Sequence, residues 1–313
     1  MHEQDQRVSM GTDETKSKVA KRGHAVQTVE TAMHDPSLLE KIALRVDSGD
    51  VELPAMSSIA RSASRLRAIP DLSGRELQLL IEGEPAVASQ VIRLANTAYY
   101  KPYGPRVTNL RMALVRLGNR SVANLIETIA MSDFCQMGPD GAKRYLRQMW
   151  TNTLYSAIAA RALATMTKSA DPEDAYLLGL FHNVGEPLLI RLLAEEKIDG
   201  VFDHQNEHRL FAFMREWHEP MGKRLLHTWS FPQTAVDLAG DHHGAFDSNL
   251  QALVCLSFES ALSYGYSYFD HQPQDDRRTL ATEKLGLDAE ALDALPTDIG
   301  TTLNEALGIT ARL

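Results

Sequence analysis

The sequence is poor in cysteine. Cys135 and Cys255 are its two cysteines, and they lie far apart without forming a CxxC pair. A disulfide framework and a cysteine zinc site both need closely patterned cysteines, so the sequence predicts neither. Two reduced thiols are typical of a cytoplasmic protein.

An excess of basic charge and a long apolar run are also missing. The formal net charge is -9, whereas a nucleic-acid-binding protein needs a basic face to neutralise phosphates. The polar N-terminus has no apolar core of a secretory signal, and apolar runs are interrupted well before the roughly 18 residues of a membrane span. We therefore expect a soluble cytoplasmic protein whose partners include neither nucleic acid nor a membrane.

Several enzyme signatures are absent as well. The sequence contains no P-loop, no glycine-rich dinucleotide turn and no serine nucleophile motif. Each of these motifs places backbone N–H groups or a nucleophile beside a substrate. The sequence therefore gives no indication of dinucleotide chemistry or of a serine hydrolase.

Apolar residues recur with helical spacing along the 313-residue chain, of which 44% is hydrophobic. Asp35 and Pro36 are typical of a helix start, and Ser73 followed by Glu76 forms a capping-box pattern. A later helix is indicated by the stripe Val122, Leu125, Ile126 and Ile129. No segment of the N-terminal half alternates with period two, so we predict an all-α fold.

Composition divides the chain into three parts. Residues 1–33 are polar and charged, and we expect a disordered tail there. Residues 34–269 carry the helical patterns of the main domain. Residues 270–313 are predicted to form a polar linker and a C-terminal helical extension.

The most informative stretch runs from Gly179 to Glu186. An apolar, helix-like segment leads directly to His182 and Asn183, and Gly185 follows where the backbone can turn. This is the layout of a polar site at the end of a buried helix. An amide at position 183 attracts a divalent cation less strongly than a carboxylate would.

Three further motifs carry a resemblance to a known family. They are Leu53-Pro54-Ala55-Met56, the segment 93–100 (RLANTAYY) and the segment 107–118 (VTNLRMALVRLG). In this order they are similar to the successive signatures of HDOD domains, and the similarity extends from about residue 51 to residue 243. HDOD domains are a bacterial, all-helical offshoot of the HD superfamily found in signalling proteins. The resemblance implies a multi-helix bundle in which an N-terminal helical subdomain packs on an HD-like helical subdomain.

The resemblance also implies where an HD-type metal centre would lie. The first histidine ligand would fall at Asn152, the His-Asp pair at His182 and Asn183, and the distal aspartate at Phe258 or Glu259. Of these four ligands His182 alone is retained. We therefore expect no catalytic residues, no metal and no cofactor, only a residual pocket at the ancestral site.

Three other histidines keep an alternative open. His218, His242 and His243 stand where HD relatives with larger metal centres place additional ligands. With His182 they would form an all-imidazole site suited to a divalent metal.

Three functions follow from these observations. The first is non-catalytic signal transduction through contacts with an unidentified signalling protein or through sensing of a small ligand. The second is a metal-dependent phosphohydrolase acting on a nucleotide or cyclic dinucleotide. The third is a nucleotide-binding module without catalysis. We predict the first, and hence no enzymatic activity.

Other polar clusters have simpler interpretations. His204 and His208 lie among polar neighbours and are predicted to be on the surface. Two clusters remain open between binding and ordinary packing or solvation: the loop residues Tyr99, Tyr100, Lys101, Tyr103 and Arg106, and the helical row Arg111, Arg116 and Arg120.

Overall fold

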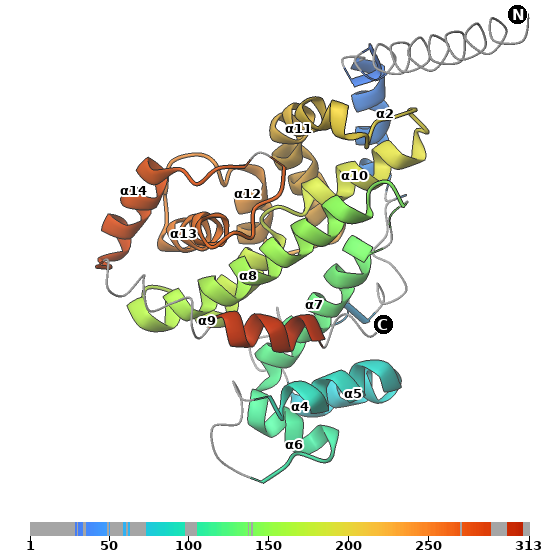
Figure 1. Cartoon of the computed structure of the whole chain (residues 1–313). Helices are drawn as coiled ribbons and strands as arrows, with labels where there is room; N and C mark the ends of the chain where they lie inside the picture. Colours follow the sequence, from blue (N-terminus) through green and yellow to red (C-terminus); the bar gives the residue numbers. More distant parts are fainter. Residues whose placement is uncertain are drawn as a thin grey trace, which may run out of the picture.

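The computed structural model of the protein describes residues 29, 31–33, 36–48, 50, 59–60, 62, 73–97, 105–136, 138, 140–269, 271–288 and 299–308. Throughout these ranges the regular structure is helical, and no strand occurs in them. The predicted all-α fold is therefore confirmed (Figure 1).

The helices are α2 (Pro36–Asp47), α4 (Gly74–Glu82), α5 (Pro85–Leu94), α6 (Leu110–Leu117), α7 (Asn119–Gln136), α8 (Lys143–Thr167), α9 (Pro172–Phe181), α10 (Gly185–Glu195), the 3-10 turn η1 (His204–Asn206), α11 (Glu207–Thr228), α12 (Gln233–Gly240), α13 (Asn249–Ser263) and α14 (Asp275–Leu285). Residues 299–308 are also helical.

Several helices begin where a side chain satisfies their first backbone N–H groups. The Ser73 hydroxyl accepts from the Glu76 amide and donates to the Glu76 carboxylate, so the predicted start of α4 is correct. The Asp171 carboxylate accepts from the amides of Glu173 and Asp174 at the start of α9. These contacts are local in sequence, which is why the sequence alone indicates them.

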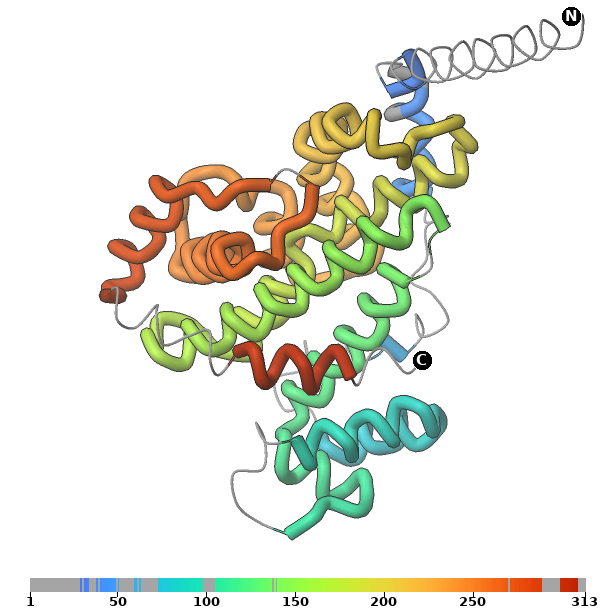
Figure 2. The backbone as a smooth tube through the Cα atoms, in the orientation of Figure 1, coloured from blue at the N-terminus to red at the C-terminus, as the bar shows by residue number. Residues whose placement is uncertain are grey.

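The centre of the fold is an antiparallel pair formed by α8 and α9. A Cβ added to Gly179 would lie 2.9 Å from the Cα of Ala157, so glycine is what allows the two helices to approach so closely. Helix α13 also packs on α8. Most residues of α9 and α13 and the inner face of α8 are buried, and they form the core around which the other helices are arranged (Figure 2).

The N-terminal helices α4, α5 and α6 form a group that packs against α7 at one end of the molecule (Figure 1). The Asn96 side chain ties this group together, because its amide donates to the carbonyl of Val107 and its oxygen accepts from the Val107 N–H. The two-part arrangement of an N-terminal helical subdomain on a larger helical subdomain agrees with the prediction.

At the opposite end, α2 packs on α11 and is held by ion pairs. Lys41 pairs with Glu196 and Arg45 pairs with Glu195, each at 2.5 Å. Most of the predicted N-terminal tail lies outside the described residues. Its described residues 29 and 31–33 are helical, and Val29 and Met33 are buried. The predicted domain limits stay a prediction.

One described stretch has the length and composition of a membrane-crossing helix. It runs from Pro172 to Glu195 through α9 and α10, and 89% of its most apolar window is buried inside the protein. The core helices of a globular domain pass the same test, so this stretch is weak evidence for a membrane span.

Candidate functional site

Four histidines gather where α9, α11 and α12 meet. His182 ends α9, and the chain turns through residues 182–184 before α10 begins at Gly185. His218 lies in the middle of α11, while His242 and His243 directly follow α12. The polar site predicted at the end of a buried helix is therefore present.

The imidazole rings form a chain of contacts. The ring centroid of His242 lies 5.3 Å from that of His182, 5.0 Å from that of His218 and 4.3 Å from that of His243. The His218 and His243 rings are 5.2 Å apart. The structure thus brings together all four histidines that the sequence proposed as alternative metal ligands.

Backbone carbonyls fix the tautomers of two of these rings. Nδ1 of His182 lies 2.8 Å from the Gly179 carbonyl, and Nδ1 of His218 lies 2.8 Å from the Met214 carbonyl. A carbonyl only accepts, so each Nδ1 carries the proton and donates it. In the neutral rings both Nε2 atoms therefore carry a lone pair, which is the form that binds a metal. The lone pair of His218 accepts from Nε2–H of His242 at 3.2 Å.

Burial keeps the imidazoles of His182 and His242 neutral. Desolvation lowers the pKa of His182 to about 4, against weaker opposing effects of the Gly179 carbonyl and the Glu186 carboxylate. Burial, followed by the neighbouring His243 and His218 rings, lowers the pKa of His242 well below its usual range. Nε2 of His182 is buried and has no hydrogen-bond partner among the described residues.

Glu219 joins the cluster, and the sequence analysis did not identify it. His218, Glu219, His242 and His243 each offer a ligand atom, and these atoms lie within 4.8 Å of one another. One Glu219 oxygen accepts from the His243 backbone amide at 2.9 Å and lies 3.5 Å from Nδ1 of His242. Its position next to His218 was the only available signal.

Arg277 holds the histidine-bearing turn in place. Its guanidinium donates to the backbone carbonyls of His242, His243 and Gly244, at 2.8, 2.5 and 3.1 Å. This arginine comes from α14, more than 30 residues away in sequence. The helical extension therefore helps to fix the site.

Asn183 faces away from the histidines. Its amide donates to the Tyr268 hydroxyl at 3.2 Å, and that hydroxyl donates to the Glu186 carboxylate at 2.5 Å. The other Glu186 oxygen lies 3.7 Å from Nε2 of His271. Burial alone would raise the pKa of Glu186, but His271, His218 and Tyr268 together outweigh it and lower that pKa. Glu186 is thus a buried carboxylate that the sequence analysis passed over.

The side chains at the positions assigned to the other ancestral ligands make other contacts. Gly179 contacts α8 at Ser156 and Ala157, and Asn152 lies about one turn before that contact. Because α8 and α9 are antiparallel, Asn152 is at about the same height along the pair as His182. The Asn152 side-chain amide donates to the Tyr266 carbonyl at 2.9 Å. The Phe258 ring packs edge-on against His182 with centroids 5.4 Å apart. Glu259 accepts from the Gln274 amide at 2.7 Å.

The cavity beside these residues is very small. His182, His242, His243 and Phe258 line it together with Val254, Cys255, Glu259 and Arg277, and it leaves a volume of about 10 Å³ for the centre of a water molecule. A cavity needs roughly 10–15 Å³ on this measure to hold one water. There is space for a single water or ion and none for a phosphoester.

Comparison with known proteins decides the family. Residues 53–245, more than half of the chain, match the HDOD domain family. The protein belongs to the HDOD domain family. The resemblance seen in the sequence motifs is therefore confirmed.

Three solved structures share the HDOD fold with this chain. An HDOD domain protein of unknown function from Geobacter sulfurreducens is 22% identical, with a TM-score of 0.66 and 91% of this chain and 98% of that chain covered. A candidate metal-dependent phosphohydrolase from Shewanella amazonensis SB2B is 20% identical, with a TM-score of 0.68 and 88% and 99% covered. A candidate signal transduction protein from Marinobacter aquaeolei VT8 is 21% identical, with a TM-score of 0.63 and 93% and 66% covered. At these identities the likeness shows the fold alone.

A curated relative from Treponema pallidum (strain Nichols), an uncharacterized protein, is 25% identical over 223 residues. That match covers 69% of this HDOD protein but only 42% of the relative. The chain therefore spans less than half of the length of the curated relative.

The remaining candidate residues have ordinary roles where the HDOD structure describes them. The His204 side chain is 82% exposed and His208 is exposed, as predicted. Arg116 donates to the carbonyls of Ala95 and Pro105, and Arg120 pairs with Asp171 and Asp174, so these two arginines bind within the chain. The tyrosines predicted to form a loop cluster lie outside the described residues.

Proposed function

We propose that this HDOD protein is a non-catalytic signalling module that acts by binding a separate protein. The observation that carries the proposal is the small cavity beside the histidines, with a volume of about 10 Å³. A hydrolase must place a metal-bound water against a phosphorus atom, which needs an open coordination position facing a substrate pocket. The substrate pockets of small molecules are usually about 300–1,000 Å³.

The polar groups around the site support the same proposal. Asn152 and Asn183 stand where an imidazole and a carboxylate would be needed, and their amides donate to Tyr266 and Tyr268. The Phe258 ring covers one side of His182. Two neutral amides and an aromatic ring supply no anionic ligand, so they favour a structural role for this pocket.

A groove between α4 and α6 is the surface that we assign to the partner. Leu79 and Val115 are 61% and 83% exposed, and both line the groove together with Arg75 and Arg111. Neither arginine side chain forms a hydrogen bond or an ion pair within the described part of the chain. Exposed apolar side chains flanked by unpaired cations favour an acidic helix with one apolar face as the occupant.

Two measurements test the proposal. Untagged protein is incubated with bis(4-nitrophenyl) phosphate and with cyclic dinucleotides in the presence of Mn²⁺, Zn²⁺ or Mg²⁺. We expect a hydrolysis rate equal to that measured without protein. Synthetic acidic amphipathic peptides are then titrated against the wild type and Val115→Glu, with Leu44→Glu as the matched control, because Leu44 is a 65% exposed leucine on α2. Turnover that His182→Ala abolishes, or equal peptide binding by both variants, would contradict the proposal.

Metal binding is the second candidate function, and a specific observation favours it. Nε2 of His218 and Nε2 of His242 are 3.2 Å apart. Two nitrogens bound to one tetrahedral zinc at 2.0–2.1 Å are separated by about 3.3 Å, so the pair already has the spacing of two ligands. The residues fit a divalent metal.

His218, His242 and His243 would hold the ion through imidazole nitrogens, with the second Glu219 oxygen as the fourth ligand. The first Glu219 oxygen would orient the His242 ring through Nδ1, as carboxylates commonly do beside metal-bound histidines. A bound ion would act as a Lewis acid. The small volume of the adjoining cavity favours a stabilising role for the ion over a hydrolytic one.

Metal analysis separates the two candidates. Untagged protein is loaded with Zn²⁺, dialysed and measured by plasma mass spectrometry for the wild type, His242→Ala and His204→Ala. The second candidate predicts one ion per chain that is lost in His242→Ala and kept in His204→Ala, whose ring is on the surface. Equal metal content in all three proteins would refute it. A thermal shift with a cyclic dinucleotide but without metal would instead favour the nucleotide-binding alternative.

A further inference from the structure

A second cavity lies away from the histidines, where α7, the start of α8 and the C-terminal helix of residues 299–308 meet. Its volume is about 440 Å³, within the range of small-molecule sites. Its lining residues are Cys135, Gln136, Lys143, Leu146, Arg147, Trp150, Thr151 and Leu307. None of them takes part in the histidine site.

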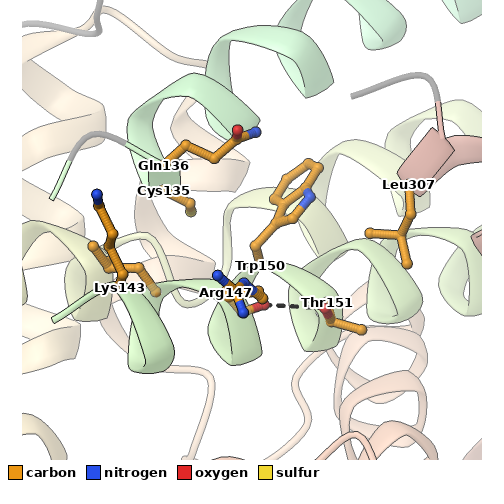
Figure 3. Close-up of a pocket in the computed structure, with 8 residues that line it drawn as sticks. Cys135, Gln136, Lys143, Arg147, Trp150, Thr151 and Leu307 are labelled. Carbon is orange, nitrogen blue, oxygen red and sulfur yellow. Dashed lines mark hydrogen bonds between the residues drawn. The ribbon is translucent and has the colours of Figure 1, made fainter. Parts of the chain in front are cut away.

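Helix α8 supplies two parallel rows to this cleft. Lys143, Arg147 and Thr151 follow one another at intervals of four residues and form a polar row, while Leu146 and Trp150 form an apolar row beside it. Residues at these spacings share one face of a helix. Figure 3 shows the polar row along α8 and the Trp150 indole rising between Gln136 and Leu307. From Lys143 to Thr151 the helix rises by about 12 Å.

The side chains on the apolar side of the cleft are largely buried. Leu146 is 1% exposed, Trp150 is 5% exposed and Cys135 is 2% exposed. Burial raises the pKa of the Cys135 thiol, so this side chain is a neutral part of the wall. The wall is thus suited to an aliphatic or aromatic body.

The polar side carries two positive charges available to a ligand. The Arg147 guanidinium has no hydrogen bond or ion pair within the described ranges of the chain. Lys143 pairs with Asp140 at 2.6 Å, but that aspartate side chain is 95% exposed, and exposed ion pairs are weak and easily exchanged. An arginine and a lysine one turn apart form a receptor for one anionic group.

We propose that this cleft binds an amphipathic anion, with its apolar body along Leu146, Trp150 and Leu307 and a terminal carboxylate or phosphate at Arg147 and Lys143. Because Leu307 belongs to the C-terminal helix, binding would couple that helix to α8. The site is independent of the proposed signalling function.

Calorimetric titration of the 313-residue chain tests this proposal with three probes: decanoate, decyl phosphate and the neutral 1-decanol. We expect at least one of the two anions to bind with a stoichiometry of one molecule per chain. Its binding should quench tryptophan fluorescence in the wild type, and this quenching should be lost in Trp150→Phe. Loss of charged hydrogen bonds in the double variant Lys143→Gln/Arg147→Gln should weaken anion binding by about tenfold or more, without changing the affinity for decanol. The matched control Arg215→Gln, an exposed arginine on α11, should bind like the wild type.

Comparing the affinities for decanoate and decyl phosphate shows whether the site prefers a carboxylate or a phosphate headgroup. Either preference agrees with the proposal. Three results would overturn it: no saturable binding of either anion, equal affinity of the double variant and Arg215→Gln, or decanol binding as tightly as both anions. All substituted cations are exposed, so their replacement leaves the folded core intact.

Discussion

The close approach of α10 to α11 at Gly185 gives the sharpest prediction. A Cβ added to Gly185 would lie 1.9 Å from the His218 carbonyl oxygen and 2.8 Å from the Gly222 amide nitrogen. Real Cβ contacts essentially never fall below 3.0 Å. In Gly185→Ala the backbone of α11 must therefore move by about 1 Å or more, and His218 must move with it.

The magnitude follows from what the new methyl group meets. Overpacking a core typically costs about 1–3 kcal/mol, and the upper end applies here because a backbone carbonyl cannot rotate away as a side chain would. We expect Gly185→Ala to lower the free energy of unfolding by about 3 kcal/mol. For a protein of this size that corresponds to a decrease of roughly 5–10 °C in Tm.

Two other alanine variants provide a graded control. At Gly222 the nearest atom to an added Cβ is the Gly185 nitrogen at 3.3 Å, and at Gly83 it is the Leu80 carbonyl at 3.8 Å. Gly83→Ala should leave stability unchanged or raise it by up to about 1 kcal/mol, because alanine restricts the unfolded chain. Gly222→Ala should fall between the other two.

Urea denaturation followed by far-UV circular dichroism measures all three variants against the wild type. Equal stability of Gly185→Ala and Gly83→Ala would refute the proposed contact between α10 and α11. A wild-type-like Zn²⁺ affinity in Gly185→Ala would show that the contact does not position His218.

Three other substitutions should have smaller effects on stability. Burial raises the pKa of Glu259 above 4.5, so the stability that this carboxyl contributes is complete below pH 4.5 and is lost as the pH rises through its folded pKa. In Glu259→Gln the side-chain oxygen still accepts from the Gln274 backbone amide. The free energy of unfolding of this variant should therefore rise relative to that of the wild type between pH 4.5 and pH 8. A difference in unfolding free energy that stays constant with pH in urea titrations would disprove this. Tyr268→Phe leaves the buried Glu186 carboxylate without its 2.5 Å hydrogen bond and should cost about 1.5–3 kcal/mol; a Tm equal to that of the wild type would contradict this role. Arg120→Gln breaks ion pairs on a side chain that is 42% exposed and should cost less than about 1 kcal/mol, and a larger loss in thermal melts would show that the pairing is cooperative.

The sequence by itself determined the helices and the family. Helix starts such as Ser73 with Glu76, or Asp171 before α9, are fixed by hydrogen bonds between residues a few positions apart. The prediction that Asn152 and Asn183 stand at ancestral ligand positions rests on residue identity and on the resemblance to the family.

Only the tertiary structure decided which side chains meet. Glu219 faces His242 because α11 and the turn after α12 are brought together by the packing of α11 on α12. Asn183 turns toward Tyr268 instead, and Leu307 reaches the Trp150 cleft from the far end of the chain. Such contacts depend on the packing of helices that are distant in sequence, and no local periodicity or capping pattern encodes that packing.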